Sequence, residues 1–148
     1  MRTFAALAAV ALLAVVGCGS VADKNEYVDG VNHATTTLTR EMSAIGDVGT
    51  GDPAAIAGTL DKGGKAIDNA ADDFAAITPP ADAKHAHRQM VSGLHDLAGT
   101  LREAARAARA KDTKTLIQLV GDITTSKGAK ELEAAQHELQ ANGYKFAS

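Results

Sequence analysis

The chain has few of the residues that cross-link or stiffen a small protein: one cysteine, no tryptophan, three prolines and only 3% aromatic residues. A single cysteine cannot form an intramolecular disulfide, so the fold must be held by packing. With so few rings, sugar binding by stacking is disfavoured. Alternating apolar and polar stretches bounded by turn residues are also missing after residue 18. We therefore expect an all-α protein without a sheet.

The first eighteen residues have the organisation of an export signal. Arg2 gives a positive start, residues 4–16 form an unbroken run of thirteen apolar residues, and small residues follow. Such a run is too short to cross about 30 Å of hydrocarbon as a helix, which takes roughly 20 residues. It predicts a cleavable signal peptide over residues 1–17.

The residues that close this segment, Val15-Val16-Gly17-Cys18, resemble the lipobox of bacterial lipoproteins. In that family the cysteine thiol receives a diacylglycerol and becomes the first residue of the mature protein. The resemblance implies a lipid anchor on Cys18 and a place on the extracytoplasmic face of the cell membrane, with residues 18–22 as the tether. Two acyl chains hold a protein stably, whereas one binds only marginally. The alternative is a free or buried thiol in an N-terminal helix.

Removal of the signal would leave 131 of the 148 residues, the usual size of one domain. The formal net charge of −3 is mildly acidic and gives no reason to expect nucleic acid as a partner. We expect a monomer.

Four helices are predicted between residues 23 and 143, at about 24–46, 53–77, 80–111 and 113–142. Each carries apolar residues at steps of three and four, which keep one face pointing inward. Four such helices joined by short loops pack most simply as an antiparallel up-down four-helix bundle.

The boundaries of these helices rest on capping and breaking residues. Asp23 with Glu26 has the spacing of a capping box, and Asp52 and Asp112 are further N-cap residues. The prolines in segment 78–80 end the second helix. In the last helix the heptad slips phase over residues 124–128, which predicts a local bend.

An even number of antiparallel helices places the lipid anchor and the C-terminal tail, residues 144–148, at the same pole of the bundle. We expect this tail to be frayed. The alternative is that Tyr144 and Phe146 enter the lipid headgroup layer while Lys145 pairs with anionic lipid.

Five histidines raise the question of a metal or haem site. Two ligands on one helix need a spacing of three or four, which no histidine pair has. Only His87 takes an inward heptad position, where a lone histidine is more often hydrogen-bonded than a ligand. We expect no cofactor, and His87 is the one candidate metal ligand. Asp82 with His85 and Glu133 with His137 are mixed pairs that could hold zinc adventitiously.

The third predicted helix carries a basic ridge, defined as Arg88, His95, Arg102, Arg106 and Arg109. Four of these five residues follow strict seven-residue spacing, so they share one flank. The ridge could contact an anionic wall polymer, lipid headgroups or an acidic protein. The alternative is neutralisation by Glu103 and by the acids of the second helix, Asp61, Asp68, Asp72 and Asp73.

Catalytic signals are weak. Ser92 and His95 are close enough in sequence to touch, but nothing marks a nucleophile turn or an oxyanion hole. Gly63-Gly64-Lys65 lies inside a predicted helix and lacks the strand that precedes a phosphate loop. We expect a protein that is not an enzyme.

The whole pattern resembles the small helical lipoproteins of high-GC Gram-positive bacteria. The likeness rests on the lipobox, on a composition rich in alanine and aspartate, and on the Pro79-Pro80 break before a helix that bears histidines and arginines. It implies a membrane-anchored binding or interaction module of the cell envelope. The alternative is a bundle that carries or senses a metal, haem or small ligand near His87.

Overall fold

The computed structural model describes residues 20–45 and 51–147. This part of the chain contains helices and no strand, in agreement with the predicted all-α class. The expected signal peptide, the lipobox with Cys18, the expected end of the first helix at Gly46 and the final Ser148 lie outside the described residues.

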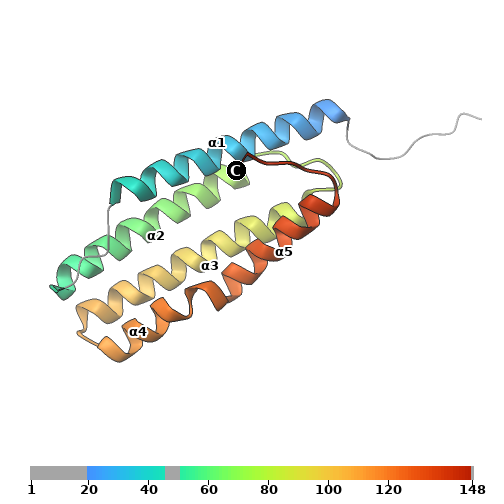
Figure 1. Cartoon of the computed structure of the whole chain (residues 1–148). Helices are drawn as coiled ribbons and strands as arrows, with labels where there is room; N and C mark the ends of the chain where they lie inside the picture. Colours follow the sequence, from blue (N-terminus) through green and yellow to red (C-terminus); the bar gives the residue numbers. More distant parts are fainter. Residues whose placement is uncertain (1–19, 46–50, 148) are drawn as a thin grey trace, which may run out of the picture.

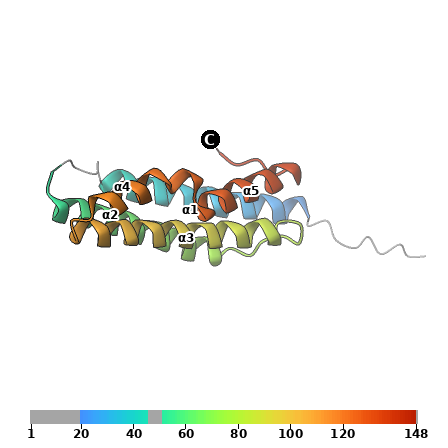
Figure 2. The ribbon, with the colours of Figure 1, turned by 90° about the horizontal axis from the view of Figure 1, so that it is seen from below.

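The helices are α1 (Val21–Ile45), α2 (Pro53–Ala75), α3 (Lys84–Arg109), α4 (Thr113–Gly121) and α5 (Lys127–Ala141), with the 3-10 turn η1 (Ile123–Thr125) between the last two. α1, α2 and α3 run antiparallel in succession, and α4 and α5 return along α3 (Figure 1). Seen from below, α2 and α3 form one layer, while α1, α4 and α5 lie on the other side (Figure 2). α3 packs on α2, α4 and α5, whereas α1 packs mainly on α2.

The start of α1 differs from the sequence expectation. The Ser20 amide donates to the Asp23 carboxylate at 2.9 Å, and the Asp23 amide donates to the Ser20 hydroxyl at 3.2 Å. This reciprocal pair is a capping box with Ser20 as its N-cap, so the predicted box of Asp23 with Glu26 is wrong. The helix begins at Val21, inside the segment expected to be a tether.

α2 begins where Asp52 and Pro53 predict. The Asp52 carboxylate accepts a hydrogen bond from the Ala54 amide at 3.1 Å. The helix ends at Ala75, two residues before the expected Ile77, because the Ile77 amide turns back to the Phe74 carbonyl at 3.0 Å.

α3 starts at Lys84 and not at residue 80. Residues 81–83 form a turn in which the Ala83 amide donates to the Pro80 carbonyl at 3.0 Å, and the regular helix follows it. At its C-terminal end Lys111 adopts a left-handed conformation with φ 57°. The Asp112 amide then reaches the Ala107 carbonyl at 2.9 Å, which is the bond of a Schellman cap.

The expected continuous helix over 113–142 is broken into two. The break falls at residues 122–126, where the extended Ser126 caps α5 by accepting a hydrogen bond from the Ala129 amide at 3.2 Å. A bend was expected over 124–128, but the chain ends one helix and starts another. The start of α5 places Gly128 against Gly93 of α3, and each of these glycines lies close to the carbonyl oxygen of the other.

The core has two clusters of buried side chains. One lies at the N-terminal pole, which we define as the start of α1, loop 76–83 and the end of α5; its largest members include Tyr27, Phe74, Leu139 and Tyr144. The other lies at the far pole, where Leu60 meets alanines of α2 and α3. The small alanines let these two helices approach closely. α4 buries none of its residues, and its Ile117 is exposed.

The C-terminal tail is not frayed, and that expectation is wrong. Residues 142–147 run from α5 back toward α1 across the mouth between the two helices (Figure 1). Tyr144 is only 3% exposed, its ring stacks with Phe146 at 6.3 Å between centroids, and the Ala147 amide donates to the Asn32 side chain at 3.0 Å. Burial of Tyr144 also removes it as a contact for lipid headgroups. The rings of Tyr144 and Phe146 therefore pack into the core cluster at this pole, in the space between α1 and α5.

Candidate functional site

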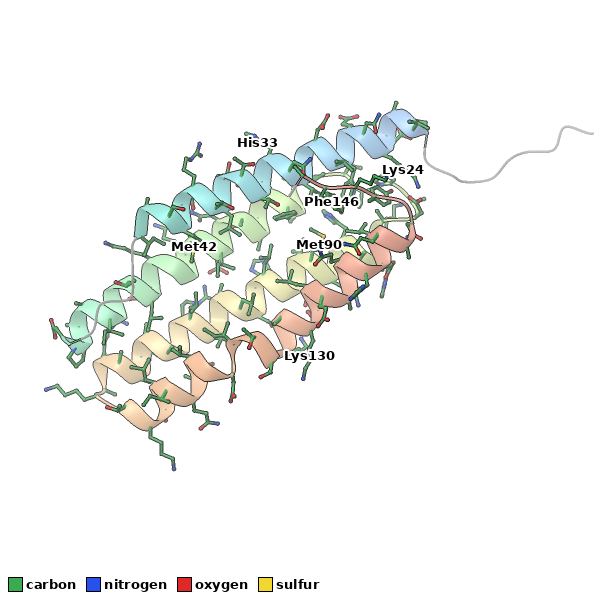
Figure 3. The ribbon with its side chains drawn as sticks, in the orientation of Figure 1. Lys24, His33, Met42, Met90, Lys130 and Phe146 are labelled. Atoms are coloured by element: carbon green, nitrogen blue, oxygen red, sulfur yellow. The ribbon has the colours of Figure 1, made fainter. Side chains whose placement is uncertain are left out.

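Asp82 is the centre of a polar network at the N-terminal pole. Its carboxylate accepts hydrogen bonds from the Lys24 ammonium at 2.6 Å and from the Tyr144 hydroxyl at 2.7 Å, and its backbone carbonyl accepts from the Asn142 side chain at 2.8 Å. The bonds from Lys24 and Tyr144 lower the pKa of the Asp82 carboxyl. The network joins α1, loop 76–83 and the C-terminal tail, and Figure 3 shows Lys24 and Phe146 at this end of the bundle.

The Lys24 ammonium also lies 4.8 Å from the centroid of the Tyr144 ring, a cation–π distance. Burial, followed by the bond to Asp82, raises the pKa of Tyr144, so this hydroxyl stays protonated as a donor. Nothing in the local sequence around Lys24 or Asp82 predicts this network, because each of its hydrogen bonds joins two residues that lie 58 to 118 positions apart along the chain.

A buried Tyr27–His87 pair lies beside this network. The Tyr27 hydroxyl is 3.1 Å from His87 Nδ1, and the two side chains are 1% and 6% exposed. Burial raises the pKa of Tyr27 to about 12, so its hydroxyl keeps its proton, and burial lowers the pKa of His87, so the ring is neutral at pH 7. The pair therefore shares one hydrogen bond between a neutral phenol and Nδ1 of a neutral imidazole.

His87 is the one buried histidine of the described residues, in line with its inward heptad position. His87 is also among the residues that line a surface hollow of about 350 Å³, together with Ala75, Arg88, Val91 and Ser92. This residue thus lies between the core and a concave part of the surface.

The other histidines are exposed. His85 bonds to Glu138 at 2.6 Å and not to Asp82, while His137 lies 3.9 Å from Glu133. His33 points away from the bundle on the outer side of α1 (Figure 3). Residues 20–45 and 51–147 contain no group of three His, Cys, Asp or Glu side chains that could hold a metal ion.

Three members of the basic ridge lie against carboxylates of α2. Arg102 and His95 both contact Asp68, and Arg109 contacts Asp61. We call these contacts the α2–α3 ladder. The alternative interpretation of the ridge, neutralisation by the second helix, therefore applies to these three residues.

The remaining ridge residues differ from the ladder. Arg106 has only Glu103 of its own helix, at 3.6 Å. Arg88 forms no ion pair with any carboxylate in the described part of the chain. Among the expected counter-charges, Asp72 and Asp73 likewise take part in no ion pair within those residues. Arg88 is thus the ridge cation with the least internal compensation.

A second hollow, of about 690 Å³, opens between the start of α1 and loop 76–81. Its walls combine the acids Asp23 and Glu26 with Tyr27 and the two prolines of the loop. The Pro79-Pro80 sequence, which predicted only the end of the second helix, contributes to one side of it.

The described residues show no catalytic arrangement around Ser92 and His95. His95 Nδ1 bonds to Asp68 at 3.2 Å, so its partner is a carboxylate of α2 and not the Ser92 hydroxyl. Gly63 and Gly64 are buried against α3, where Gly64 faces the Ala98 carbonyl, so they serve close helix packing.

None of the helices in the described ranges combines the length and apolar character needed to span a bilayer. Comparison of the chain with protein-family models, with curated proteins and with solved structures gives no match in any of the three.

Proposed function

We propose that this protein is a lipid-anchored, non-enzymatic interaction module on the extracytoplasmic face of a cell membrane, acylated at Cys18. The observation that carries the proposal is the position of the Val15-Val16-Gly17-Cys18 segment, directly ahead of Ser20, the N-cap of α1. A lipoprotein needs an export signal that ends at a cysteine, with the folded domain after it.

The domain itself is, in this proposal, an up-down four-helix bundle whose fourth helix is divided into α4 and α5. The successive antiparallel course of α1, α2 and α3 supports this description (Figure 1). With only Gly19 between Cys18 and Ser20, the N-terminal pole would lie close to the bilayer. The 25 residues of α1 would then carry the far pole about 37 Å outward, at roughly 1.5 Å per residue.

The contact surface in this proposal is the α3 flank that carries Arg88 and Arg106. These arginines have no carboxylate partner from α2, whereas Arg102 and Arg109 do. A partner with negative charge, an anionic envelope polymer or an acidic protein, would be attracted first to the cations that α2 does not neutralise.

The anchor is tested by fractionation of cells that produce the wild-type chain or Cys18→Ser. The wild-type protein should incorporate labelled palmitate and enter the detergent phase, and Cys18→Ser should do neither. If Cys18→Ser entered the detergent phase as fully as the wild type, the proposed lipid anchor would be refuted.

The contact surface is tested with charge reversals at matched positions. Arg88→Glu combined with Arg106→Glu should abolish salt-sensitive retention on an anionic polymer, because it removes the two ridge cations that no α2 carboxylate contacts. Arg102→Glu combined with Arg109→Glu is the control, since Asp68 and Asp61 already compensate these two arginines and the net charge changes equally. Equal losses from both variants would show that the flank acts only through net charge.

A small-ligand carrier is the second candidate function. One observation favours it: the buried His87 is among the residues that line a surface hollow.

A further inference from the structure

Residues 142–147, which we call the strap, lie against parts of the molecule that are far from them in the sequence. The strap crosses from the end of α5 to α1 (Figure 1). Beyond α5, its hydrogen bonds and ring contacts reach four residues, which we call the strap site: Lys24, Tyr27, Asn32 and Asp82. Three of these belong to α1 and one to loop 76–83. The strap therefore joins α1 and this loop to the end of α5.

α1 has few other attachments on this side of the molecule. It packs on α2, and no comparable packing joins it to α3 or α5 within the described residues. At the N-terminal pole Lys24 bonds to Asp82 and Tyr27 bonds to His87. The remaining contacts, from Lys24 and Asn32, go to the strap itself. Release of the strap would leave α1 on α2 and would uncover Tyr27 and Asn32.

Side-chain contacts hold the strap in place, and backbone pairing contributes little. Tyr144 is buried, whereas Lys145 and Ala147 are exposed. The amides of Lys145 and Phe146 form no hydrogen bond within the described part of the chain. Gly143, where the strap leaves α5, has φ 84°, and a Cβ atom there would meet nothing within 4 Å. A short terminal segment with one buried side chain can detach locally while the helices stay folded.

The chemistry of the strap shows what its site accepts. The Tyr144 ring meets the edge of the Tyr27 ring at 5.5 Å between centroids, and its hydroxyl donates to Asp82 at 2.7 Å. Lys24 lies over the same ring as a cation. Phe146, two positions further on, stacks on Tyr144 and packs against the core cluster of this pole. The site thus fits a phenol followed two positions later by a second aromatic ring.

The strap covers only part of the surface along α1. A hollow of about 380 Å³ lies where the strap reaches α1, and it is lined by Ala147 together with Asn32, Thr35, Thr36, Thr39 and Arg40. Spacings of three and four residues place these α1 residues on one face of the helix. An extended segment longer than the strap would therefore reach contacts that the strap does not make.

We propose that the strap is an internal ligand of a peptide-binding site on α1 and loop 76–83, and that an extended segment of a partner protein displaces it. The segment carries a tyrosine that takes the place of Tyr144 and a second aromatic residue two positions later, and it continues along α1 toward Thr39. The strap is then an autoinhibitory contact that keeps the site closed. The inference goes beyond the proposed function, because neither the Cys18 anchor nor the basic ridge uses the strap site.

The test is a ¹⁹F NMR titration of the full chain in detergent micelles, labelled with meta-fluorotyrosine. The chain has two tyrosines, so Tyr27 and Tyr144 are reported separately. The probe is an unlabelled synthetic peptide with the sequence of residues 142–147, titrated through the millimolar range because a tethered segment competes at an effective concentration of about millimolar. We expect saturable growth of a Tyr144 resonance at the position of a free tail, with unchanged helical circular dichroism.

The matched control is the same peptide with serine in place of both aromatic residues, which should displace nothing. Equal displacement by the control peptide, or no displacement by the probe, would overturn the proposal. It would also be overturned if the free Tyr144 resonance appeared only together with loss of helical circular dichroism, because the strap would then open only when the whole domain unfolds.

Two variants of the tethered strap sharpen the test. Asn142→Ala removes the side-chain bond to the Asp82 carbonyl from the strap but not from the peptide. Half-displacement should then need about three- to tenfold less peptide, as expected for the loss of one neutral hydrogen bond. Lys145→Ala, at an exposed strap position, should leave the midpoint unchanged. Equal midpoints for Asn142→Ala and the wild type would contradict displacement.

A second copy of this chain is the competing occupant. If two copies exchanged their straps, the elution volume on size exclusion would fall with rising protein concentration and the peptide would reverse the change. That result would overturn the assignment to a separate partner, whereas a constant elution volume together with displacement supports it. Cys18→Ser should release the protein from the membrane and leave the titration unaltered, so failure of the proposed anchor and failure of this inference are distinguishable.

Discussion

The carbonyl oxygen of Gly93 would lie 2.5 Å from a Cβ atom placed on Gly128, and the carbonyl of Gly128 would lie 2.7 Å from one placed on Gly93. α3 and α5 therefore cross backbone against backbone. Gly128→Ala should lower the free energy of unfolding by about 1–3 kcal/mol, because the helices must separate to admit the methyl group. Chemical denaturation followed by circular dichroism measures the change.

Gly99→Ala is the matched control for this crossing. Gly99 also lies in a helix, but a Cβ there meets nothing within 4 Å. The substitution should stabilise the protein by about 0.5–1 kcal/mol through helix propensity alone. If Gly128→Ala raised stability as Gly99→Ala is expected to do, the close crossing would be refuted.

Helix formation in this chain could be predicted from local signals, because capping and apolar spacing act within a few residues. Asp52 and Asp112 cap helices where expected, since each is followed by a residue that fits the first turn. Local capping signals did not identify the residue at which α1 begins. Ser20 and Asp23 are both competent caps three residues apart, and the reciprocal bond between them uses both.

The C-terminal tail and the buried Tyr27–His87 pair depend on contacts that the local sequence does not contain. Tyr144 is buried by Tyr27 and Asp82, which lie more than 60 residues away in the chain. The inward position of His87 follows from the heptad, but its hydrogen bond to Tyr27 and its place beside a hollow follow from the packing of α1 and α2 around α3.

Stability should depend on pH through His87. Burial lowers the pKa of His87 in the folded state below its usual value of 6.5, so the unfolded chain binds a proton more readily. The free energy of unfolding should therefore fall as the pH drops below about 6.5 and level off below the folded-state pKa. His87→Gln should flatten the dependence in that window. His33→Gln is the control, and an equal flattening from it would contradict the assignment.

The hydroxyl of Tyr144 should stabilise the attachment of the tail. Tyr144→Phe removes its bond to Asp82 while the ring stays in place, and should cost about 1–3 kcal/mol because a partly buried carboxylate loses a donor. Lys145→Ala, at the exposed neighbouring position, should change little. Thermal unfolding and proteolysis of the tail report the difference. Equal stability of Tyr144→Phe and wild type would mean that packing alone holds the tail.

Lys111 is held in a left-handed conformation that favours glycine, with φ 57°. Lys111→Gly should raise the free energy of unfolding by up to about 1 kcal/mol, since the relief of backbone strain exceeds the added entropy of the unfolded chain. Lys114→Gly makes the same change inside α4 and should instead destabilise the protein by about 1 kcal/mol. A loss of stability in both variants would rule out strain at Lys111.

The α2–α3 ladder should set how strongly the basic ridge attracts anions. Asp68→Asn leaves Arg102 and His95 without their carboxylate and should raise the salt concentration needed to elute the protein from a polyanion column. The cost in stability should stay below about 1 kcal/mol, because the pair is partly exposed. Asp72→Asn changes the net charge equally but breaks no ion pair in the described residues, so its elution should move less. If both variants eluted together, net charge and not the ladder would govern binding.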